Sequence, residues 1–312
     1  IFDDELSPAQ IKNYHKLAKK IKVIDRSALI LDIFKKRAKT REAKTQVDLA
    51  LCQYLLPRLT RQWTHLERQM GGVGTRAGMG ETQIEIDRRL IREKISKLKI
   101  DLKKIESERR TQSQNRGKEY RVALVGYTNA GKSTLFNSLT GNKVYVENQL
   151  FATLDTTVRK LKLNKKHQVL LSDTVGFIRK LPHNLVASFR STLKELLEAD
   201  YILIVLDASS NIIEEHLETI NSVLNELGAM EIPKSYIFNK IDLIKKDVYL
   251  RKLKTSFNNA IFISALHHLK LDNIKKHLID KVESDFDIFD LNIAYDQGKI
   301  LSEIQNQAEI LD

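Results

Sequence analysis

A glycine-containing loop that ends in lysine and serine is the clearest chemical signal in this sequence. The residues GYTNAGKST, 126–134, follow the apolar segment YRVALVG and match the pattern G-x-x-x-x-G-K-[ST]. In such a loop the backbone N–H groups, the start of the following helix and the lysine ammonium attract phosphate oxygens, while the serine hydroxyl can ligate Mg²⁺. We therefore predict a nucleotide site, with Lys132 in a catalytic role and Ser133 on the metal, made of Gly126, Tyr127, Thr128, Asn129, Ala130, Gly131, Lys132, Ser133 and Thr134.

The segment DTVG, residues 173–176, has the residue types for the other side of the phosphates. Asp173 can hold Mg²⁺ through water, and the Gly176 N–H can meet the γ-phosphate, so Gly176 is a catalytic candidate and Thr174 and Val175 line the site. Next comes Phe177, where Ras-like GTPases have a glutamine that orients the attacking water. A phenyl ring cannot do this, so we expect slow intrinsic hydrolysis that a partner or another part of the chain accelerates.

Two later segments predict that the base is guanine. In NKID, 239–242, the Asp242 carboxylate can accept hydrogen bonds from guanine N1–H and the 2-amino group, and Lys240 can cover the base. A backbone N–H in SAL, 264–266, can meet guanine O6. Taken singly, such residues are often turn or cap residues. Each segment nevertheless follows an apolar strand-like run, where open α/β sheets bind ligands. The predicted base-side residues are Asn239, Lys240, Asp242, Ser264, Ala265 and Leu266.

Between the phosphate loop and DTVG lies the expected position of a mobile loop that supplies a threonine to Mg²⁺ and the γ-phosphate. Thr153, Thr156 and Thr157 all qualify by position, and we favour Thr153 as metal ligand and catalytic residue. The nucleotide-contacting part of this loop is predicted to be Phe151, Ala152, Thr153, Leu154 and Asp155.

The elements that position these residues divide the chain into four regions. Strand-like runs alternate with helical segments over 119–283, which predicts a P-loop GTPase domain with a mainly parallel sheet and helices on both faces. Residues 1–40 are predicted to be the end of a small α/β domain, with a short strand at 21–25. Heptad-spaced apolar residues over 41–116 predict a long antiparallel helical hairpin, kinked at Pro57. Residues 284–312 are expected to begin a small C-terminal α/β region, so the sequence is expected to be truncated at both ends.

Charge is unevenly distributed along the chain. Residues 1–118 hold 28 Lys/Arg and 15 Asp/Glu, a net +13, whereas residues 119–312 hold 24 and 25, a net −1. This asymmetry favours a polyanionic partner, although a solvated helix surface gives the same pattern. An acidic membrane surface would require an aromatic or Leu-rich face, which the basic helices lack. We expect a cytoplasmic protein, since no apolar run reaches 18 residues and the single Cys52 supports neither a disulfide nor a zinc site.

Five of the twelve glycines lie in GGVGTRAGMGE, 71–81. No strand-like run precedes them, so the nucleotide cradle is predicted elsewhere. A flexible hairpin turn stays the alternative, although such a turn needs only one or two glycines. We interpret 71–80 as a thin tip on a basic arm that can enter a narrow RNA cavity. The predicted RNA contacts are Gly71, Gly72, Gly74, Arg76, Gly78, Gly80, Arg88, Arg89 and Arg92.

The chain resembles the HflX family of ribosome-associated GTPases, in the wider Obg-HflX group. The resemblance covers nearly the whole chain and rests on LSPAQ, DRSALILDIFKKRAKTREAKTQVDLALCQYLLPRL, GGVGTRAGMGETQIEIDRRLIREKI, GYTNAGKSTLFNSLT, FATLDTTVRKL and SDTVGFIRKLPHNLVASFRSTLKE. It implies binding to the large ribosomal subunit, splitting of stalled ribosomes, and ribosome-stimulated hydrolysis of GTP to GDP with Mg²⁺. We expect a monomer off the ribosome. Ala77 and Met79 depart from the family loop G-x-G-x-R-G-P-G-E, which bears on its RNA contacts.

Two other functions are consistent with parts of the sequence. Phe177 allows a non-hydrolysing, nucleotide-gated RNA-binding switch, because the usual catalytic glutamine is missing. A P-loop ATPase that remodels RNA would share the phosphate loop, but Asp242 argues against adenine.

Overall fold

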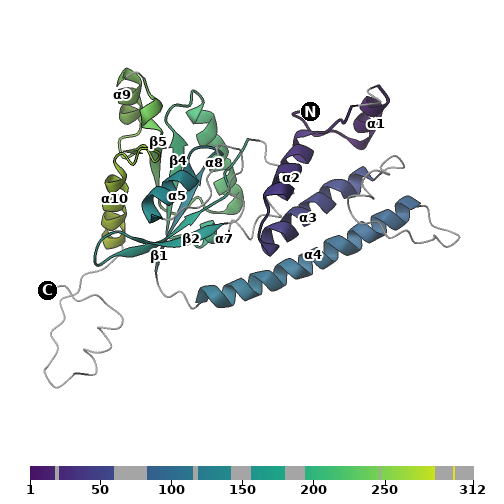
Figure 1. Ribbon diagram of the computed structural model, residues 1–312, viewed down its shortest axis with the longest axis horizontal. Coiled ribbons are helices and arrows are strands. Elements are labelled where there is room, and N and C mark those ends of the chain that lie inside the picture. The colour runs from purple at the N-terminus through teal and green to yellow at the C-terminus, as the bar shows by residue number, and fades with distance from the viewer. Residues whose placement is uncertain are drawn as a thin grey trace.

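The computed structural model shows helices at the N-terminus followed by an α/β sheet (Figure 1). It describes residues 1–17, 21–59, 83–114, 119–141, 156–179, 194–245, 247–284 and 298. The N-terminal helices are α1 (Pro8–Leu17), α2 (Arg26–Arg37), α3 (Arg41–Leu55), η1 (Leu56–Arg58) and α4 (Gln83–Gln114).

The sheet confirms the predicted GTPase fold class. Its strand order is β2-β3-β1-β4-β5-β6, with β2 antiparallel to β3 and all other neighbours parallel. The strands are β1 (Tyr120–Gly126), β2 (Thr157–Lys162), β3 (Gln168–Asp173), β4 (Tyr201–Asp207), β5 (Lys234–Asn239) and β6 (Ile261–Phe262). Between and after them lie α5 (Lys132–Thr140), α7 (Lys194–Leu197), α8 (Ile213–Leu227), η2 (Ile241–Leu243), α9 (Asp247–Ser256) and α10 (Leu271–Ser284).

Alternation along the strands builds a core on each face of the sheet. Val122 and Leu124 of β1 belong to one buried cluster with α5 and α10, while Ala123 and Val125 belong to a second cluster with α8 and α9. Successive side chains of a strand point to opposite faces, so an apolar run of this kind is buried on both sides. The carboxyl ends of the parallel strands therefore meet at one edge, where the predicted nucleotide segments lie.

The predicted strand at 21–25 is wrong. In this segment the structure has only a single bridge, between Phe2 and Asp25. The carboxylate of Asp25 is fully buried, caps α2 by accepting from the Ala28 N–H at 2.8 Å, and accepts from Tyr54 Oη at 2.9 Å. A residue that caps a helix uses its side chain for the first turn, so the chain bends into α2 here instead of continuing as a strand.

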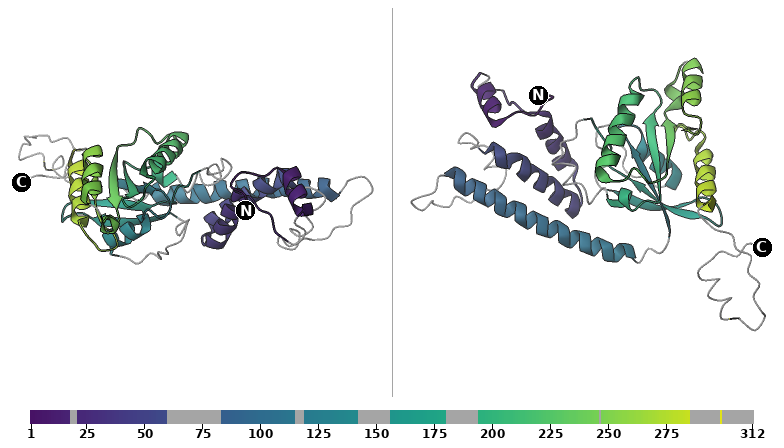
Figure 2. Two further views of the ribbon diagram at one scale, coloured as in Figure 1. Left: turned by 90° about the horizontal axis from the view of Figure 1, so that it is seen from above. Right: turned by 180° about the vertical axis from the view of Figure 1, so that it is seen from behind.

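Helices α3 and α4 lie side by side and run in opposite directions (Figures 1 and 2). Helix α3 ends at Leu55 and is followed by the short η1, because Pro57 lacks the N–H that would continue the α-helix. The described residues therefore show the end of a helix where the sequence predicts a kink. Of the predicted α4 seam, Ile91 is buried, and Leu98 and Leu102 are half-buried. The glycine tip and the rest of 60–82 lie outside the described residues, so the domain boundaries stay a prediction.

Candidate nucleotide-binding site

The phosphate loop connects β1 to α5 through positions that tolerate little side chain. A Cβ on Gly126 would lie 2.2 Å from the carbonyl oxygen of Val205 in the neighbouring strand. Gly131 has φ +93°, and a Cβ there would lie 2.2 Å from Asn239 Nδ2. Both glycines of the motif are therefore fixed by close approach, which is the physical reason for their spacing.

Lys132 is buried within this loop. Its ammonium donates to the carbonyl oxygens of Gly126 at 3.1 Å and Tyr127 at 3.0 Å. Burial lowers the pKa of Lys132 to about 8, against the opposing effect of the Asp173 carboxylate. Since desolvation disfavours the charged form, an anionic phosphate in the loop would favour it again. The ammonium is thus held at the place where the sequence predicts phosphate.

The residue that follows the DTVG segment is bonded to the phosphate loop. The Phe177 N–H donates to Gly126 O at 3.0 Å, and the Thr128 N–H donates to Phe177 O at 2.8 Å. A Cβ on Gly176 would lie 2.8 Å from Thr128 Cα and Cγ2 and 3.0 Å from Lys132 Nζ. The phenyl ring of Phe177 is buried in the sheet core that contains α8. The side chain at this position therefore serves packing of the sheet core.

Residues from the base side brace the phosphate loop. The buried Asn239 amide donates to Ala130 O at 3.0 Å and accepts from the Ala265 N–H at 2.9 Å. Lys240, at φ +64°, donates from Nζ to Asn129 O and to Asp207 Oδ2, both at 2.7 Å. The sequence reasoning missed Asp207, although its place at the end of β4 was a usable signal.

Asp242 lies beside a histidine that the sequence reasoning also missed. Its Oδ2 is 3.7 Å from His267 Nε2, and its side chain is 17% exposed. Of the SAL amides, the Ser264 N–H donates to Leu269 O at 3.2 Å, and that of Ala265 is used by Asn239. The carboxylate of Asp242 is thus partly exposed, as a guanine acceptor must be, and two of the three amides already have partners.

The N-terminal helices pack directly against the DTVG segment. Val175 and Ile178 are buried in one cluster with Phe34 of α2 and Tyr54 of α3. Arg26 Nη2 also donates to the carbonyl oxygen of Arg179 at 2.8 Å. These partners are far apart in sequence, and no motif or period indicated them. Val175 and Ile178 therefore link the phosphate side of the site to the helices that precede it.

The tyrosine of the phosphate loop belongs to the same contact. The Tyr127 ring stacks on His216 of α8, with centroids 3.9 Å apart, and its hydroxyl accepts from the Arg179 N–H at 3.1 Å. Burial lowers the pKa of His216, which favours the neutral ring, while Asp207 and Glu215 act in the opposite direction. Tyr127 thus joins the loop, α8 and the residue after Ile178.

The magnesium prediction is consistent with the positions of two of its predicted donors. Asp173 is fully buried at the end of β3, opposite Thr157 in the β2–β3 register, and Ser133 is in the first turn of α5. The described residues contain no group of three or more His, Cys, Asp or Glu for a metal. Mg²⁺ with one carboxylate, one hydroxyl, phosphate oxygens and water needs no such group, so these residues fit it.

Some predicted residues lie outside the described part of the chain. These are Phe151, Ala152, Thr153, Leu154 and Asp155, and the tip residues Gly71, Gly72, Gly74, Arg76, Gly78 and Gly80. Arg88, Arg89 and Arg92 are exposed on α4. The choice of Thr153 and the RNA contacts stay predictions.

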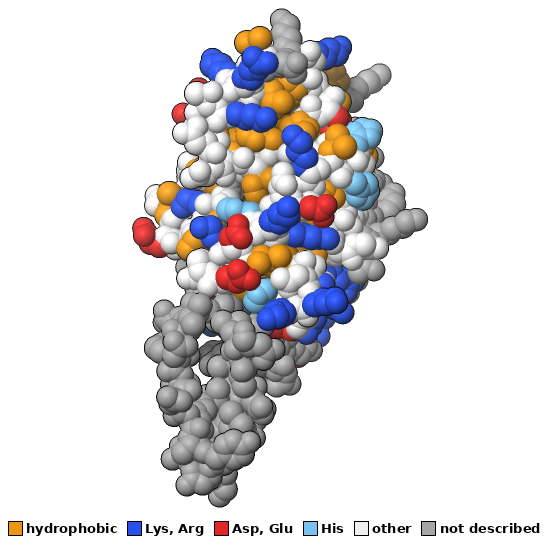
Figure 3. All heavy atoms as spheres, turned by 90° about the vertical axis from the view of Figure 1, so that its left-hand side faces the viewer, with side chains coloured by type: hydrophobic (Ala, Val, Ile, Leu, Met, Phe, Trp, Pro, Cys, Tyr) orange, Lys and Arg blue, Asp and Glu red, His pale blue; other side chains and the backbone are white. Residues whose placement is uncertain are grey.

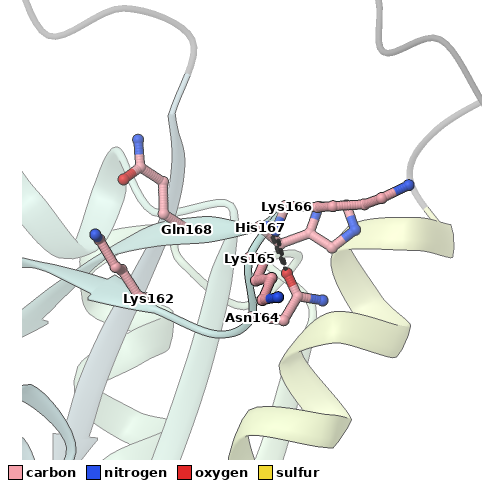
Figure 4. A pocket seen from close by; sticks show the side chains of 6 residues that line it. All are labelled: Lys162, Asn164, Lys165, Lys166, His167 and Gln168. Atoms are coloured by element: carbon pink, nitrogen blue, oxygen red, sulfur yellow. Dashed lines mark hydrogen bonds between the residues drawn. The ribbon is translucent and has the colours of Figure 1, made fainter.

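A second basic surface lies at the turn between β2 and β3, away from the phosphate loop (Figure 4). It encloses a shallow hollow of about 730 Å³, and Asn164 Oδ1 holds the turn by accepting from the N–H groups of Lys166 and His167 at 2.8 and 2.6 Å. Its lining residues are Lys162, Asn164, Lys165, Lys166, His167 and Gln168. Since β2 is an edge strand, Lys162 also protects that edge from pairing with another chain.

The curated relatives decide which family this is. The chain is 48% identical over 303 residues to GTPase HflX of Flavobacterium psychrophilum, covering 90% of this chain and 73% of the relative. It is 43% identical over 305 residues to GTPase HflX of Escherichia coli (strain K12), covering 97% and 71%. The chain belongs to the GTPase HflX family. The resemblance noted in the sequence is therefore confirmed, and so is GTP hydrolysis as the reaction, which favours a hydrolysing enzyme over the two alternative functions.

Family models match this chain in three parts. The GTP-binding GTPase N-terminal model matches residues 1–35, the GTP-binding GTPase middle region 37–116, and the 50S ribosome-binding GTPase model 121–240. Among solved structures, a GTP-binding protein from Sulfolobus solfataricus in complex with GDP has a TM-score of 0.53 at 27% identity, covering 90% of this chain and 79% of that one. The SsGBP and GDP complex gives 0.55 at 28%, covering 90% and 80%. No helix among the described residues could span a membrane.

Proposed function

We propose that this HflX-family GTPase binds the large ribosomal subunit and uses GTP to split stalled ribosomes. The description of the matched family, 50S ribosome-binding GTPase, supports this choice of subunit. The net +13 of residues 1–118 supports a polyanionic partner, since each phosphate that is neutralised releases counterions.

Each nucleotide group has a proposed partner at the site. The loop from Gly126 to Thr134, with Lys132, binds the β- and γ-phosphates, and the Gly176 N–H contacts the γ-phosphate. Ser133, Thr153 and Asp173, the last through water, would hold Mg²⁺, which neutralises phosphate charge when bound. On the base side, Asp242 accepts from guanine N1–H and the 2-amino group. Leu266 supplies the amide for O6, because the Ser264 and Ala265 amides bond to Leu269 and Asn239.

One contact supports the proposal that nucleotide state controls the arm, the predicted helical hairpin of residues 41–116. DTVG and the residues after it bond to the phosphate loop through Phe177, and pack on α2 and α3 through Val175 and Ile178. Helix α3 in turn lies along the basic helix α4 (Figure 2). A change at the γ-phosphate that moves DTVG must therefore repack the helices that hold α4, because a packed core does not deform continuously.

The arm itself is the proposed RNA-contacting part. Between Arg88 and Lys104, α4 has eight Lys/Arg and two Asp/Glu. The face formed by α9 and α10 instead mixes both signs with hydrophobic side chains (Figure 3). The tip at 71–80 is the proposed contact with rRNA of the large subunit, and its glycines allow close approach to RNA.

GTP turnover with and without large subunits tests the proposal. We expect large subunits to increase the rate of GTP turnover. We also expect more of the protein to co-sediment with large subunits in GTP or a non-hydrolysable analogue than in GDP. No stimulation, together with the same sedimentation in every nucleotide, would reject the ribosomal role. Splitting itself is read from the conversion of 70S ribosomes to subunits in the same profiles.

Matched charge variants locate the contact. Arg88→Ala with Arg92→Ala removes two cations from one face of α4, and Lys165→Ala with Lys166→Ala removes two from the β2–β3 turn. We expect Arg88→Ala with Arg92→Ala to weaken binding to the large subunit and to leave nucleotide affinity unchanged. The salt dependence of subunit binding should fall by the amount expected for the loss of about two phosphate contacts. Equal loss from both pairs would contradict the assignment to the arm. Gly74→Val with Gly78→Val should likewise spare nucleotide binding and reduce stimulation by the ribosome.

A further inference from the structure

The side chain at position 177 cannot orient the attacking water. Phe177 is 3% exposed and packs in the core cluster that includes Leu196 and Ile202. Its backbone N–H and C=O are both bonded to the phosphate loop, at Gly126 and Thr128, so the direction of its side chain is fixed. Hydrolysis in this chain therefore needs a different group beside the γ-phosphate.

Thr128 carries a buried hydroxyl that lacks a hydrogen bond. The residue is 7% exposed, and its Oγ1 has no hydrogen-bond partner among the described residues. Buried polar groups are nearly always bonded, and an unbonded one costs about 1–3 kcal/mol. Packing alone would be served at lower cost by valine, which has the same shape. The hydroxyl is therefore suited to a partner that arrives with the nucleotide.

Thr128 lies where the γ-phosphate is expected. The point that a Cβ on Gly176 would occupy is 2.8 Å from Thr128 Cγ2 and 3.0 Å from Lys132 Nζ, so all three residues meet there. Lys132 and Gly176 are the two γ-phosphate contacts proposed above. The Thr128 backbone is fixed by its N–H bond to Phe177 O at 2.8 Å, which limits where the hydroxyl can move.

We propose that the Thr128 hydroxyl is a positioning residue for GTP hydrolysis, which accepts a hydrogen bond from the attacking water. The water oxygen bonds to the γ-phosphorus while the bond from that phosphorus to the bridging oxygen breaks, and GDP leaves with the electron pair. The water proton passes to a γ-phosphate oxygen, which yields inorganic phosphate. Thr128 itself is unchanged, and its hydrogen bond fixes the direction from which the water approaches.

Two variants separate the hydroxyl from the shape of the side chain. Thr128→Val keeps the shape and loses the hydroxyl, whereas Thr128→Ser keeps the hydroxyl and loses the methyl group that faces Gly176. The measurements are single-turnover GTP hydrolysis by the protein alone, equilibrium affinity for GDP and for a non-hydrolysable GTP analogue, and the thermal unfolding midpoint without nucleotide.

We expect Thr128→Val to lower the single-turnover rate about 10- to 100-fold, with both affinities within about twofold of the parent. Thr128→Ser should stay within about threefold of the parent rate. The unfolding midpoint of Thr128→Val should be unchanged or higher, because an unbonded buried hydroxyl has been removed. Thr174→Val provides the contrast in stability: its hydroxyl donates to Leu124 O at 2.6 Å, so its midpoint should fall.

Three results would overturn the proposal. The first is a Thr128→Val rate within about threefold of the parent. The second is an equal loss of rate and of GTP-analogue affinity, which would make Thr128 a contact to the bound nucleotide and not to the water. The third is a Thr128→Ser variant as slow as Thr128→Val, which would assign the effect to the methyl contact with Gly176.

Discussion

The base side and the phosphate side of the site are held in different ways. At the base side, Asn239 and Lys240 use their polar atoms to bind Ala130, Ala265, Asn129 and Asp207, so the loops are fixed from within the GTPase fold. At the phosphate side, the DTVG segment is held partly by the apolar core of α2 and α3. Directional polar networks specify one arrangement, whereas a packing contact between helices and a loop can have alternatives. We infer that base recognition is fixed and that nucleotide-dependent change is confined to the phosphate side.

The largest expected effect is on base recognition. Asp242→Asn replaces the proposed acceptor of guanine N1–H and the 2-amino group, so GTP affinity should fall about a hundredfold and the preference should move toward xanthosine triphosphate. Competition binding with both nucleotides measures this. Asp272→Asn, an exposed change of equal charge on α10, is the control and should bind GTP as the parent does. An unchanged guanine preference in Asp242→Asn would remove this residue from the base side.

The next effect concerns Asn239, which bonds the base side of the site to the phosphate loop. Asn239→Ala leaves the Ala265 N–H and the Ala130 carbonyl without their partner, so the free energy of unfolding should fall by about 2 kcal/mol. Urea unfolding without nucleotide measures this. Asn225→Ala, at an exposed position of α8, should change it by less than about 0.5 kcal/mol. Similar losses in both variants would contradict a bracing role.

A smaller effect tests the packing of the phosphate side on the N-terminal helices. Ile178→Val should cost about 1 kcal/mol, and in a double-mutant cycle with Phe34→Leu the two losses should differ from additivity by about 0.5 kcal/mol or more, because both residues belong to one cluster. Ile274→Val, in the core cluster of α5 and α10 on the other face of the GTPase sheet, should be additive with Phe34→Leu. Additivity in both cycles would mean that the helices and the DTVG segment are independent.

The smallest expected effect is a pH dependence limited to the phosphate side. The pKa of Lys132 is lowered to about 8 in the nucleotide-free protein, and bound phosphate favours the charged form. Binding therefore takes up a proton above pH 8, and GDP affinity should fall several-fold from pH 8 to pH 9. Lys132→Gln should bind GDP more weakly at both values and lose the part of the pH dependence that belongs to the lysine. If GDP affinity changed equally with pH in the parent and in Lys132→Gln, the pKa of Lys132 would not be the cause of the pH dependence.

The same shift has a definite sign for stability. Between about pH 8 and the ordinary lysine pKa of about 10.5, the unfolded chain binds more protons at this group than the folded chain does. The contribution of Lys132 to the free energy of unfolding therefore rises as pH increases through that window.

Local patterns in the sequence predicted the parts of the site that are local in structure. The loop at 126–134, DTVG and NKID each lie at the carboxyl end of a strand, because a buried apolar run followed by glycine or a polar residue determines both elements. The strand at 21–25 failed because one buried residue, Asp25, caps α2. The contact of Arg26 with Arg179 spans 153 residues and has no periodic signature, so it could not be predicted from one sequence.

Two residues show where motif reading reaches its limit. The NKID motif predicts a nucleotide contact for Asn239, which stays a prediction; in the structure its amide donates to the Ala130 carbonyl and accepts from the Ala265 N–H. The sequence marks Phe177 as an unusual residue at the glutamine position, and the structure shows that its ring lies in the sheet core. In both cases the motif identifies the residue type but not the partners of its side chain, because those partners depend on tertiary packing.

The length of α4 has a mechanical consequence. At about 1.5 Å per residue its 32 residues extend about 48 Å, so a rotation of only about 5° at the end near the sheet would displace the other end by about 4 Å. A displacement of that size is comparable to the rise of one helical turn, about 5.4 Å. The rearrangement needed around Val175 and Ile178 can therefore be much smaller than the movement it produces at the opposite end of the helix.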